Sequence, residues 1–283
     1  MLTKLSPDMG NTSILQQIEA AVRSIRALYS AKPRVGIVLG SGLGNLSSEI
    51  KVEKEIAYSD IPHFPVSTVE GHQGKLIFGT LSGQPVAVLS GRFHYYEGYT
   101  PAQVVFPIRV LKFLGVETLL LSNAAGGMNA RFRVGDLMII HDHISLFVVN
   151  PLLGKNESEL GPRFPDMSEP YDKGLIQKAR AIAARLDIPV HEGVYAGVTG
   201  PTFETRAEYK FLHIAGGDAV GMSTVQEVIA ARHIGMSVFA MSVITDLGIR
   251  TEDNIITHAE VLAAAASAEP KLTALFKGLI TEL

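Results

Sequence analysis

Three side chains at alternate positions, Arg92, His94 and Tyr96, carry the clearest chemical signal in the sequence. They follow an apolar run that ends at Leu89 and predicts a buried strand, and alternate side chains of an extended backbone share one face. The Arg92 guanidinium can donate two hydrogen bonds at once to a tetrahedral oxyanion, His94 adds a nitrogen donor, and Tyr96 offers an apolar wall with a polar tip. The pattern predicts a cradle for a phosphate beside a sugar. A surface ion pair of Arg92 with packed tyrosines explains it equally well.

A glycine-rich motif, GSGLG at residues 40–44, follows a second apolar run at 35–39. A dinucleotide site is disfavoured because the last glycine comes one position early for G-x-G-x-x-G and no acidic residue ends the next strand. A P-loop is disfavoured because no lysine is suitably placed. The motif therefore predicts a strand-to-helix turn. Its amides and the Ser41 hydroxyl either form an anion nest or belong to a plain turn without a ligand.

Two further motifs suit a flat heteroaromatic ligand. The small residues of NAAGG at 123–127 follow a predicted strand at 118–122 and let a ring or an oxyanion approach the backbone closely, although tight packing is an equal alternative. Phe203 and Glu204 precede a predicted helix cap at Thr205. Phe203 can lie against a ring while Glu204 accepts N–H donors from its edge. The alternative for Glu204 is an acid that serves the helix dipole.

Ser223 and a pair of histidines complete the candidates. Ser223 lies in half of the hydrolase motif G-x-S-x-G, but Val225 replaces the second glycine, so a helix cap that can also hold an anion is the simpler interpretation. His141 and His143 share one predicted strand face. Without further ligands nearby, local hydrogen bonds are favoured over a metal site.

The elements that must position these residues alternate between apolar strands and amphipathic helices. Helical spacing predicts a first helix over 13–28, and strands are predicted at 35–39, 86–89, 118–122, 194–198, 219–222 and 237–244. Capping boxes predict helix starts at Thr100 (a helix that ends near Gly115), Thr205, Ser223 and Thr257, with partners at Gln103, Glu208, Gln226 and Glu260. Strand–helix–strand order implies a parallel pair, hence an α/β fold. The aperiodic segments 60–74 and 145–168 are candidate gates over the site.

Composition limits the classes of function. Of 283 residues 47% are hydrophobic and 19% charged, and the formal charge of −3 includes no block of like charges, so we expect neither nucleic-acid nor membrane partners. The absence of cysteine fits a reducing compartment, and the N-terminus lacks a secretion pattern, so we expect a cytoplasmic protein. We expect one domain over 13–283, preceded by a poorly ordered extension over 1–12.

Taken together, the motifs resemble the trimeric purine nucleoside phosphorylases, the branch that acts mainly on 6-oxopurine nucleosides. The similarity runs through five motifs in the family's order, at 36–44, 69–72, 91–99, 123–127 and 220–225. It implies a single α/β domain around a distorted mixed sheet or barrel flanked by helices. It also implies a homotrimer, no metal or organic cofactor, and inorganic phosphate as a co-substrate.

The resemblance also implies roles for individual residues. Those that would bind phosphate are Ser41, His72, Arg92, His94, the backbone of Ala124, and Ser223. Those that would hold the ribose are Tyr96, Met222 and His258. Those that would surround the base are Ala125, Gly126, Phe203, Glu204, Val220, Thr245 and Asp246. His94, Glu204 and Asp246 would be the catalytic residues, and Phe164 would reach into a neighbouring subunit's site.

Asp246 departs from the family pattern, which usually has asparagine there. A 6-oxopurine presents acceptors at O6 and N7, so an ionised Asp246 would face lone pairs, and a buried mispairing of this kind costs roughly 1 to 3 kcal/mol. Either Asp246 holds a proton because burial disfavours its charge, or the pocket also admits 6-aminopurines. We expect a 6-oxopurine enzyme with some activity on adenosine.

Three other functions fit parts of the sequence. The related methylthioadenosine phosphorylases use aspartate at the position of Asp246, but a polar His258 suits a 5′-hydroxyl better than a thioether. A non-catalytic purine nucleoside sensor is disfavoured, because mere binding of a nucleoside would need no anion cradle at Arg92 and His94. A serine hydrolase that uses Ser223 is the weakest alternative.

Overall fold

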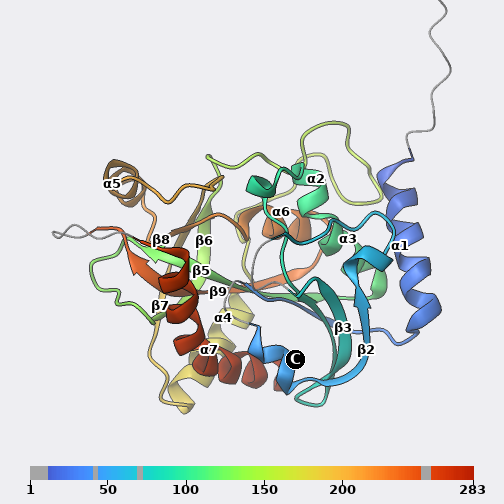
Figure 1. The fold of residues 1–283 in the computed structure, drawn as a ribbon, viewed down its shortest axis with the longest axis horizontal. Coiled ribbons are helices and arrows are strands. Elements are labelled where there is room, and N and C mark those ends of the chain that lie inside the picture. Colours follow the sequence, from blue (N-terminus) through green and yellow to red (C-terminus); the bar gives the residue numbers. More distant parts are fainter. Residues whose placement is uncertain (1–11, 41–43, 69–72, 250–255) are drawn as a thin grey trace, which may run out of the picture.

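The computed structural model describes residues 12–40, 44–68, 73–249 and 256–283. Helices α1 (Ile14–Leu28), α2 (Pro101–Val104), α3 (Phe106–Leu114), α4 (Lys173–Arg185), α5 (Arg206–Ile214), α6 (Val225–His233) and α7 (His258–Thr281) surround a mixed sheet (Figure 1). Its strands are β1 (Val35–Val38), β2 (Lys51–Ala57), β3 (Lys75–Leu81), β4 (Gln84–Ser90), β5 (Thr118–Gly127), β6 (Leu137–Ile144), β7 (Val190–Gly197), β8 (Ala219–Gly221) and β9 (Ser237–Leu247). Single 3-10 turns follow β1, β2 and β4, at Asn45–Glu49, Tyr58–Asp60 and Tyr95–Glu97.

The sheet closes on itself at one end. Within the described residues, the strand order is β2-β3-β4-β1-β5-β8-β7-β6-β9, and β9 also pairs with β5. Five strands therefore form a closed barrel, from which β1, β4, β3 and β2 extend as an open sheet. The expected parallel pairing is present, since β1 runs parallel to both β4 and β5. The α/β architecture and its distorted mixed sheet are confirmed.

Buried apolar side chains explain why these elements pack together. β5 and β9 carry near-continuous buried runs, as expected for strands covered on both faces. α7 packs against β9, and α1 packs against α3. α1 and α5 lie at opposite ends of the molecule (Figure 1). None of the helices in the described ranges combines the length and apolar character needed to cross a bilayer.

Most predicted helix starts are present. α1 begins after Ser13, and the boxes at Thr100, Thr205 and Thr257 all form. The predicted helix from Thr100 to Gly115 is wrong in one respect, because it breaks at Val105 into α2 and α3. Pro107 explains the break, since proline has no amide to donate to a carbonyl one turn earlier.

The predicted capping box of Ser223 and Gln226 is wrong. α6 begins at Val225 after Thr224, which has a φ of 68° and makes no side-chain cap bond. The Gln226 amide instead donates to the carbonyl of Val149 at 2.7 Å, in the aperiodic segment 145–168. The Gln226 side chain therefore stabilises a loop rather than the start of a helix.

Two other boundaries differ from expectation. The motif 123–127 does not follow a strand but belongs to β5, which runs on to Gly127. The backbone is not extended as far as Tyr96, because a 3-10 turn starts at Tyr95. The extension 1–11, the centre of the glycine-rich motif at 41–43, and residues 69–72 and 250–255 lie outside the described residues. The predicted disorder of the N-terminus therefore stays a prediction.

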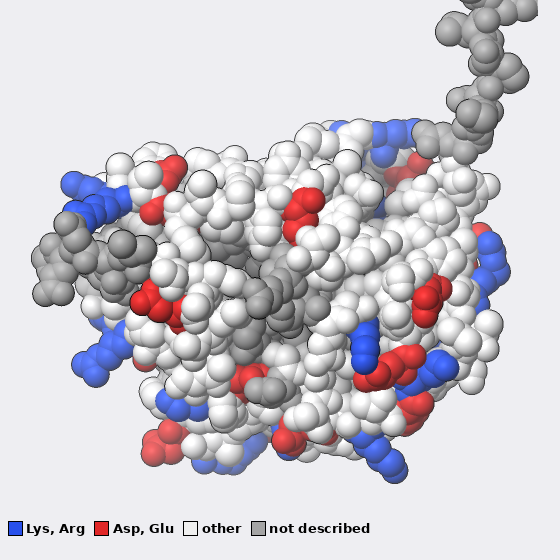
Figure 2. Space-filling view, viewed as in Figure 1, with Lys and Arg blue, Asp and Glu red and all other residues white. Residues whose placement is uncertain are grey.

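Charged side chains of both signs are scattered over the face seen in Figure 2, and neither sign gathers on it. The few ion pairs on the surface are local or join neighbouring elements, such as Arg34 with Glu117. The face therefore presents no single-sign electrostatic field to a partner.

Gly40, directly after β1, allows a close approach to β5. A Cβ atom added there would lie 2.7 Å from the carbonyl oxygen of Ser122 and 2.8 Å from Cα of Asn123, both backbone atoms that cannot rotate away. We expect Gly40→Ala to lower the free energy of unfolding, measured in urea, by about 1 to 3 kcal/mol through overpacking. Gly44→Ala is the matched control, because no atom of the described residues, apart from its chain neighbours, lies within 4 Å of its added Cβ. Equal stability of the two variants would contradict the prediction.

Candidate active site

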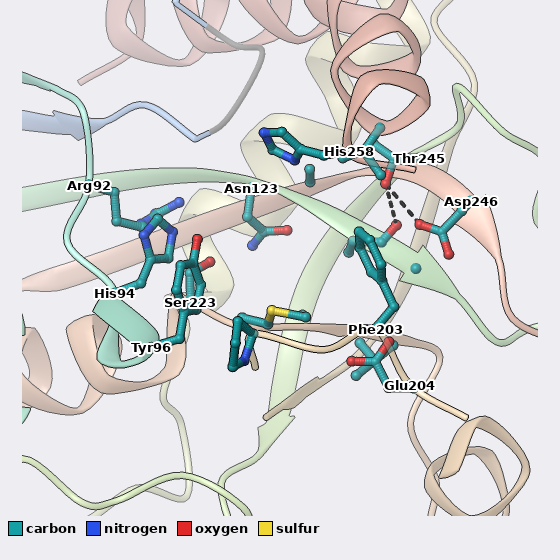
Figure 3. Close-up of a pocket in the computed structure, with 18 of the residues that line it drawn as sticks. Arg92, His94, Tyr96, Asn123, Phe203, Glu204, Ser223, Thr245, Asp246 and His258 are labelled. Carbon is teal, nitrogen blue, oxygen red and sulfur yellow. Dashed lines mark hydrogen bonds between the residues drawn. The ribbon is translucent and has the colours of Figure 1, made fainter. Parts of the chain in front are cut away.

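A cavity of about 380 Å³ lies where β5, β8 and β9 end. The side chains around it come from the segment after β4, from β5, from the segment between β7 and α5, from β8 and β9, and from the start of α7 (Figure 3). The residues that line it are Arg92, His94, Tyr96, Asn123, Ala124, Ala125, Gly126, Pro201, Phe203, Glu204, Tyr209, Val220, Gly221, Met222, Ser223, Thr245, Asp246, His258 and Val261.

The strand register explains why distant motifs meet here. Gly126 of β5 pairs with Val220 of β8 on one side and with Asp246 of β9 on the other. An irregularity in the β5–β9 register between Ala125 and Gly126 changes the direction of the side chains beyond it. Gly126 has no room for a side chain, because an added Cβ would lie 3.0 Å from Asp246 Oδ2.

The cavity has two chemically different ends. Figure 3 shows Arg92, His94, Tyr96 and Ser223 together at one end, and Phe203, Glu204, Thr245 and Asp246 together at the other. The first end supplies hydrogen-bond donors and a cation. The second supplies an aromatic ring, a hydroxyl and two carboxyl groups.

Arg92 is held inside the protein by Glu227. Its Nε donates to both carboxylate oxygens of Glu227, at 2.9 and 3.1 Å, and its Nη1 donates to the carbonyl of Ser122 at 2.8 Å. Both side chains of the pair are at least 95% buried. The predicted alternative of a surface ion pair is therefore wrong, because the partner is a buried carboxylate on α6 and Arg92 also lines the cavity.

His94 is oriented by Glu97. Glu97 Oε1 accepts from the His94 amide at 2.8 Å and lies 2.9 Å from His94 Nδ1. Burial opposes the ionisation of Glu97, but hydrogen bonds from His94 and Thr68 outweigh it and lower the Glu97 pKa to about 2. An ionised carboxylate only accepts, so Nδ1 carries the proton. Burial lowers the pKa of His94, which favours a neutral ring.

Tyr96 and Ser223 complete the donor end. The Tyr96 ring stacks on His94, with centroids 4.6 Å apart and planes 16° apart. Burial raises the Tyr96 pKa to about 12, so its hydroxyl keeps its proton. The Ser223 hydroxyl lies 3.1 Å from that of Thr224, which accepts from the Asn123 amide at 2.9 Å. In the described chain, Asn123 Oδ1 is buried without a hydrogen-bond partner.

At the opposite end, three hydroxyl and carboxyl side chains form a chain of hydrogen bonds. Thr245 Oγ1 lies 3.1 Å from Asp246 Oδ1 and 3.3 Å from the carbonyl oxygen of Ala125 (Figure 3). The Tyr209 hydroxyl donates to Asp246 Oδ2 at 3.1 Å. Burial raises the pKa of Glu204, whose Oε1 has no hydrogen-bond partner among the described residues.

The structure brings together nearly all residues that the sequence singled out. Those found around the cavity are Arg92, His94, Tyr96, Ala124, Ala125, Gly126, Phe203, Glu204, Val220, Met222, Ser223, Thr245, Asp246 and His258. Phe164 is not among them; it lies on the segment 145–168 and is 88% exposed. Ser41 and His72 lie outside the described residues.

His143 makes the expected local hydrogen bonds. Its amide donates to Asp142 at 2.8 Å, and its Nδ1 lies 3.1 Å from the Tyr171 hydroxyl. Within the described ranges, no three His, Asp or Glu side chains gather as a metal site would require.

Sequence patterns did not point to Glu97, Glu227 or Tyr209. Glu97 could have been identified from the sequence, because it is a carboxylate three residues after His94 in the same motif. Glu227 stands 135 residues from Arg92, and Tyr209 stands 37 residues from Asp246. Only the fold brings these pairs together.

Comparisons with known proteins agree on one family. The chain matches the model of the phosphorylase superfamily over residues 34–281. It is 50% identical over 266 residues to purine nucleoside phosphorylase 1 of Bacillus subtilis (strain 168), which covers 94% of this chain and 98% of that protein. Its fold is similar to that of Schistosoma mansoni purine nucleoside phosphorylase in complex with inosine, with a TM-score of 0.90, 42% identity and coverage of 95% and 97% of the two chains. Isoform 2 from the same organism, in complex with cytosine and ribose-1-phosphate, gives a TM-score of 0.91, 44% identity and coverage of 95% and 96%.

The buried ion pair of Arg92 and Glu227 makes a prediction about stability. Glu227→Ala leaves an uncompensated guanidinium in the interior, so we expect the free energy of unfolding in urea to fall by about 3 to 5 kcal/mol. The control is Glu117→Ala, which breaks the exposed Arg34–Glu117 pair and should change stability by less than about 1 kcal/mol. A loss as small as the control's would show that Arg92 does not depend on Glu227.

Proposed function

The chain belongs to the phosphorylase superfamily, among its purine nucleoside phosphorylases, and we propose that it works as a homotrimer that binds inorganic phosphate at the donor end of the cavity and the purine at the carboxyl end. The protein is a pentosyltransferase that cleaves purine nucleosides by phosphorolysis to a free purine and a pentose 1-phosphate. The observation that carries the site assignment is the division of one cavity into a donor end and an aromatic, carboxyl-lined end.

Phosphate recognition rests on fixed donors. Arg92, His94 and Ser223 meet at the donor end, and a tetrahedral anion accepts several hydrogen bonds at once. The backbone of Ala124, which also lines the cavity, is proposed to donate to the same anion. Ser41 and His72, which lie outside the described residues, are proposed to join them. Phosphate is here a co-substrate, and the proposal includes no metal or organic cofactor.

The ribose is proposed to lie between the two ends. Tyr96, Met222 and His258, which all line the cavity, are proposed to hold it, and His258, at the first position of α7, is proposed to bind the 5′-hydroxyl. Cleavage of the N-glycosidic bond develops positive charge on the sugar, which the bound phosphate stabilises before its oxygen bonds to C1′. The protein's contribution is to align the phosphate oxygen with the anomeric carbon.

The departing purine is proposed to contact Phe203 with its face and Glu204 and Asp246 with its edge. The electrons of the broken bond move into the purine ring, and hydrogen bonds at N7 and O6 stabilise the resulting negative charge. The small side chain of Ala125, which lines the cavity, lets the ring approach the backbone of β5. A 6-oxopurine has an N1–H that Glu204 can accept, which favours inosine and guanosine as substrates.

Asp246 is the feature that favours a second candidate, the cleavage of 5′-methylthioadenosine. Its carboxylate can accept from a 6-amino group, which adenine has and hypoxanthine lacks. His258 argues for a hydroxyl rather than a thioether at C5′. 5′-Methylthioadenosine should therefore be tested as a substrate beside inosine and adenosine. If the protein prefers it, cleavage of 5′-methylthioadenosine replaces cleavage of inosine as the proposed function.

The reaction is tested by its dependence on phosphate. We expect inosine to give hypoxanthine and ribose 1-phosphate only when phosphate is present, because the anion is both the nucleophile and the stabilising charge. The measurement is product analysis in buffer freed of phosphate and in buffer with phosphate restored. Equal turnover in both, with free ribose as the product, would contradict the mechanism.

The trimer is proposed from an exposed apolar segment. Leu146, Leu153 and Phe164 of the segment 145–168 are 85%, 71% and 88% exposed in one chain, which an association of subunits would bury. We infer that Phe164 reaches a neighbour's cavity, so that each site is completed by a second chain. A cytoplasmic location stays a prediction from composition.

Phe164→Ala tests this assignment. We expect the variant to raise KM for inosine by about tenfold, since a buried aromatic contact is worth about 1.5 kcal/mol or more. Phe113→Ala, which removes a half-exposed phenylalanine from α3, is the control and should leave KM unchanged. Sedimentation should give about three times the 30.4 kDa chain mass for the wild type. A monomer with full activity would contradict the proposal.

A further inference from the structure

The Tyr209 hydroxyl is fixed at the wall of the carboxyl end. Tyr209 is buried on α5 and lines the cavity. Its ring occupies the space beside Gly248, where an added Cβ would lie 2.0 Å from a ring atom. A Cβ added to Gly126 would lie 2.9 Å from the Tyr209 hydroxyl oxygen. Gly126 on β5 and Gly248, directly after β9, thus make room for this one side chain, and its position is set by packing.

Asp246 is surrounded by hydroxyl donors. Tyr209 donates to Oδ2 at 3.1 Å, and Thr245 Oγ1 lies 3.1 Å from Oδ1. Hydrogen bonds donated to a carboxylate favour its charged form. Burial and the nearby carboxylates of Asp246 and Glu204 raise the pKa of Tyr209, so its hydroxyl stays a donor. Asp246 is therefore arranged as an acceptor.

Glu204 is less completely hydrogen-bonded. Its Oε1 is buried and, within the described residues, has no hydrogen-bond partner. Burial raises its pKa, hydrogen bonding that includes Tyr209 opposes this effect only in part, and the charges of Asp246 and of Glu208 on α5 add to it. Burial therefore favours the protonated form of Glu204.

The two classes of purine need that proton in different places. If the purine lies as proposed above, a 6-oxopurine offers N1–H to an ionised Glu204 and needs a donor from Asp246. A 6-aminopurine offers its amino group to an ionised Asp246 and needs a donor from Glu204 to N1. Each class therefore requires one proton on the pair, but on a different carboxyl group.

We propose that Tyr209 is a specificity-determining residue, whose hydroxyl holds Asp246 as an acceptor for an exocyclic amino group and so admits 6-aminopurine nucleosides beside 6-oxopurine ones. This inference rests on the proposed function of the same cavity. Tyr209 acts here through Asp246 and is a positioning residue rather than a catalytic one.

The test is Tyr209→Phe, which keeps the ring beside Gly248 and removes only the hydroxyl. We measure kcat/KM for adenosine and for inosine at saturating phosphate and pH 7. A hydrogen bond to a charged group corresponds to about a tenfold change or more, so the adenosine-to-inosine ratio should fall by at least about tenfold. Loss of activity on both nucleosides in equal proportion would show a merely structural role and overturn the proposal.

Two controls make the result specific. Tyr171→Phe removes another buried hydroxyl, which lies 3.1 Å from His143 Nδ1 and outside the cavity, and should leave the ratio unchanged. Tyr209→Phe in an Asp246→Ala background should also leave the ratio unchanged, because alanine removes both the charge and the hydrogen-bond acceptor. A tenfold fall in that background would overturn the proposal, since Tyr209 would then act without Asp246.

Activity assays of the wild type distinguish a failure of this inference from a failure of the proposed function on which it rests. Failure to cleave inosine with phosphate would end the proposed function itself. Phosphate-dependent cleavage of inosine without measurable cleavage of adenosine would leave the function in place and overturn only the role of Tyr209. Thermal unfolding of each variant establishes that the ratios compare folded proteins.

Discussion

A guanidinium paired inside the protein with a buried carboxylate is the interaction on which the rest of the site depends. An unpaired ion in the interior would cost several kcal/mol, and Glu227 on α6 offsets that cost for Arg92 on the segment after β4. The pair carries no net charge, so its proposed contribution to phosphate binding is a set of donors whose directions are fixed. Arg92 is fixed further because its side chain is also bonded to the backbone of β5. The ion pair thus joins three elements at the point where the anion is proposed to bind.

The closed part of the sheet imposes a second constraint. β5 lies between β8 and β9, so that Gly126 has Val220 and Asp246 as its lateral neighbours. This register leaves little freedom for the carboxyl end of the cavity, because a shift by one residue would turn Asp246 to the other face of β9. The glycine is required for the same reason, since any side chain there would meet Asp246 and Tyr209.

Local sequence signals predicted the frame of the molecule well and its long-range contacts poorly. The strands at β1, β4 and β9 and the capping boxes at Thr100, Thr205 and Thr257 depend on neighbouring residues, and the structure contains them. The box at Ser223 failed because Gln226 finds a distant partner at Val149, which no local pattern reveals. The strand β5 was predicted too short, because small residues at 123–127 resemble a turn when their two strand neighbours are unknown.

The same distinction holds for the site. Arg92, His94 and Glu204 were identified because their residue types suit the chemistry, Asp246 was identified through the family resemblance, and all four line one cavity. What sets their charge and direction was not visible, since Glu227 and Tyr209 come from helices far along the chain. Different elements hold the two ends of the cavity: Arg92 is bonded to α6 and β5, and Asp246 is bonded to Tyr209 of α5 and to Thr245. If the two ends bind phosphate and purine as proposed, a change at Asp246 or Tyr209 alters which purine is accepted while Arg92 keeps these partners, and this separation is a physical reason why one fold can serve purines that differ in the atoms at C6.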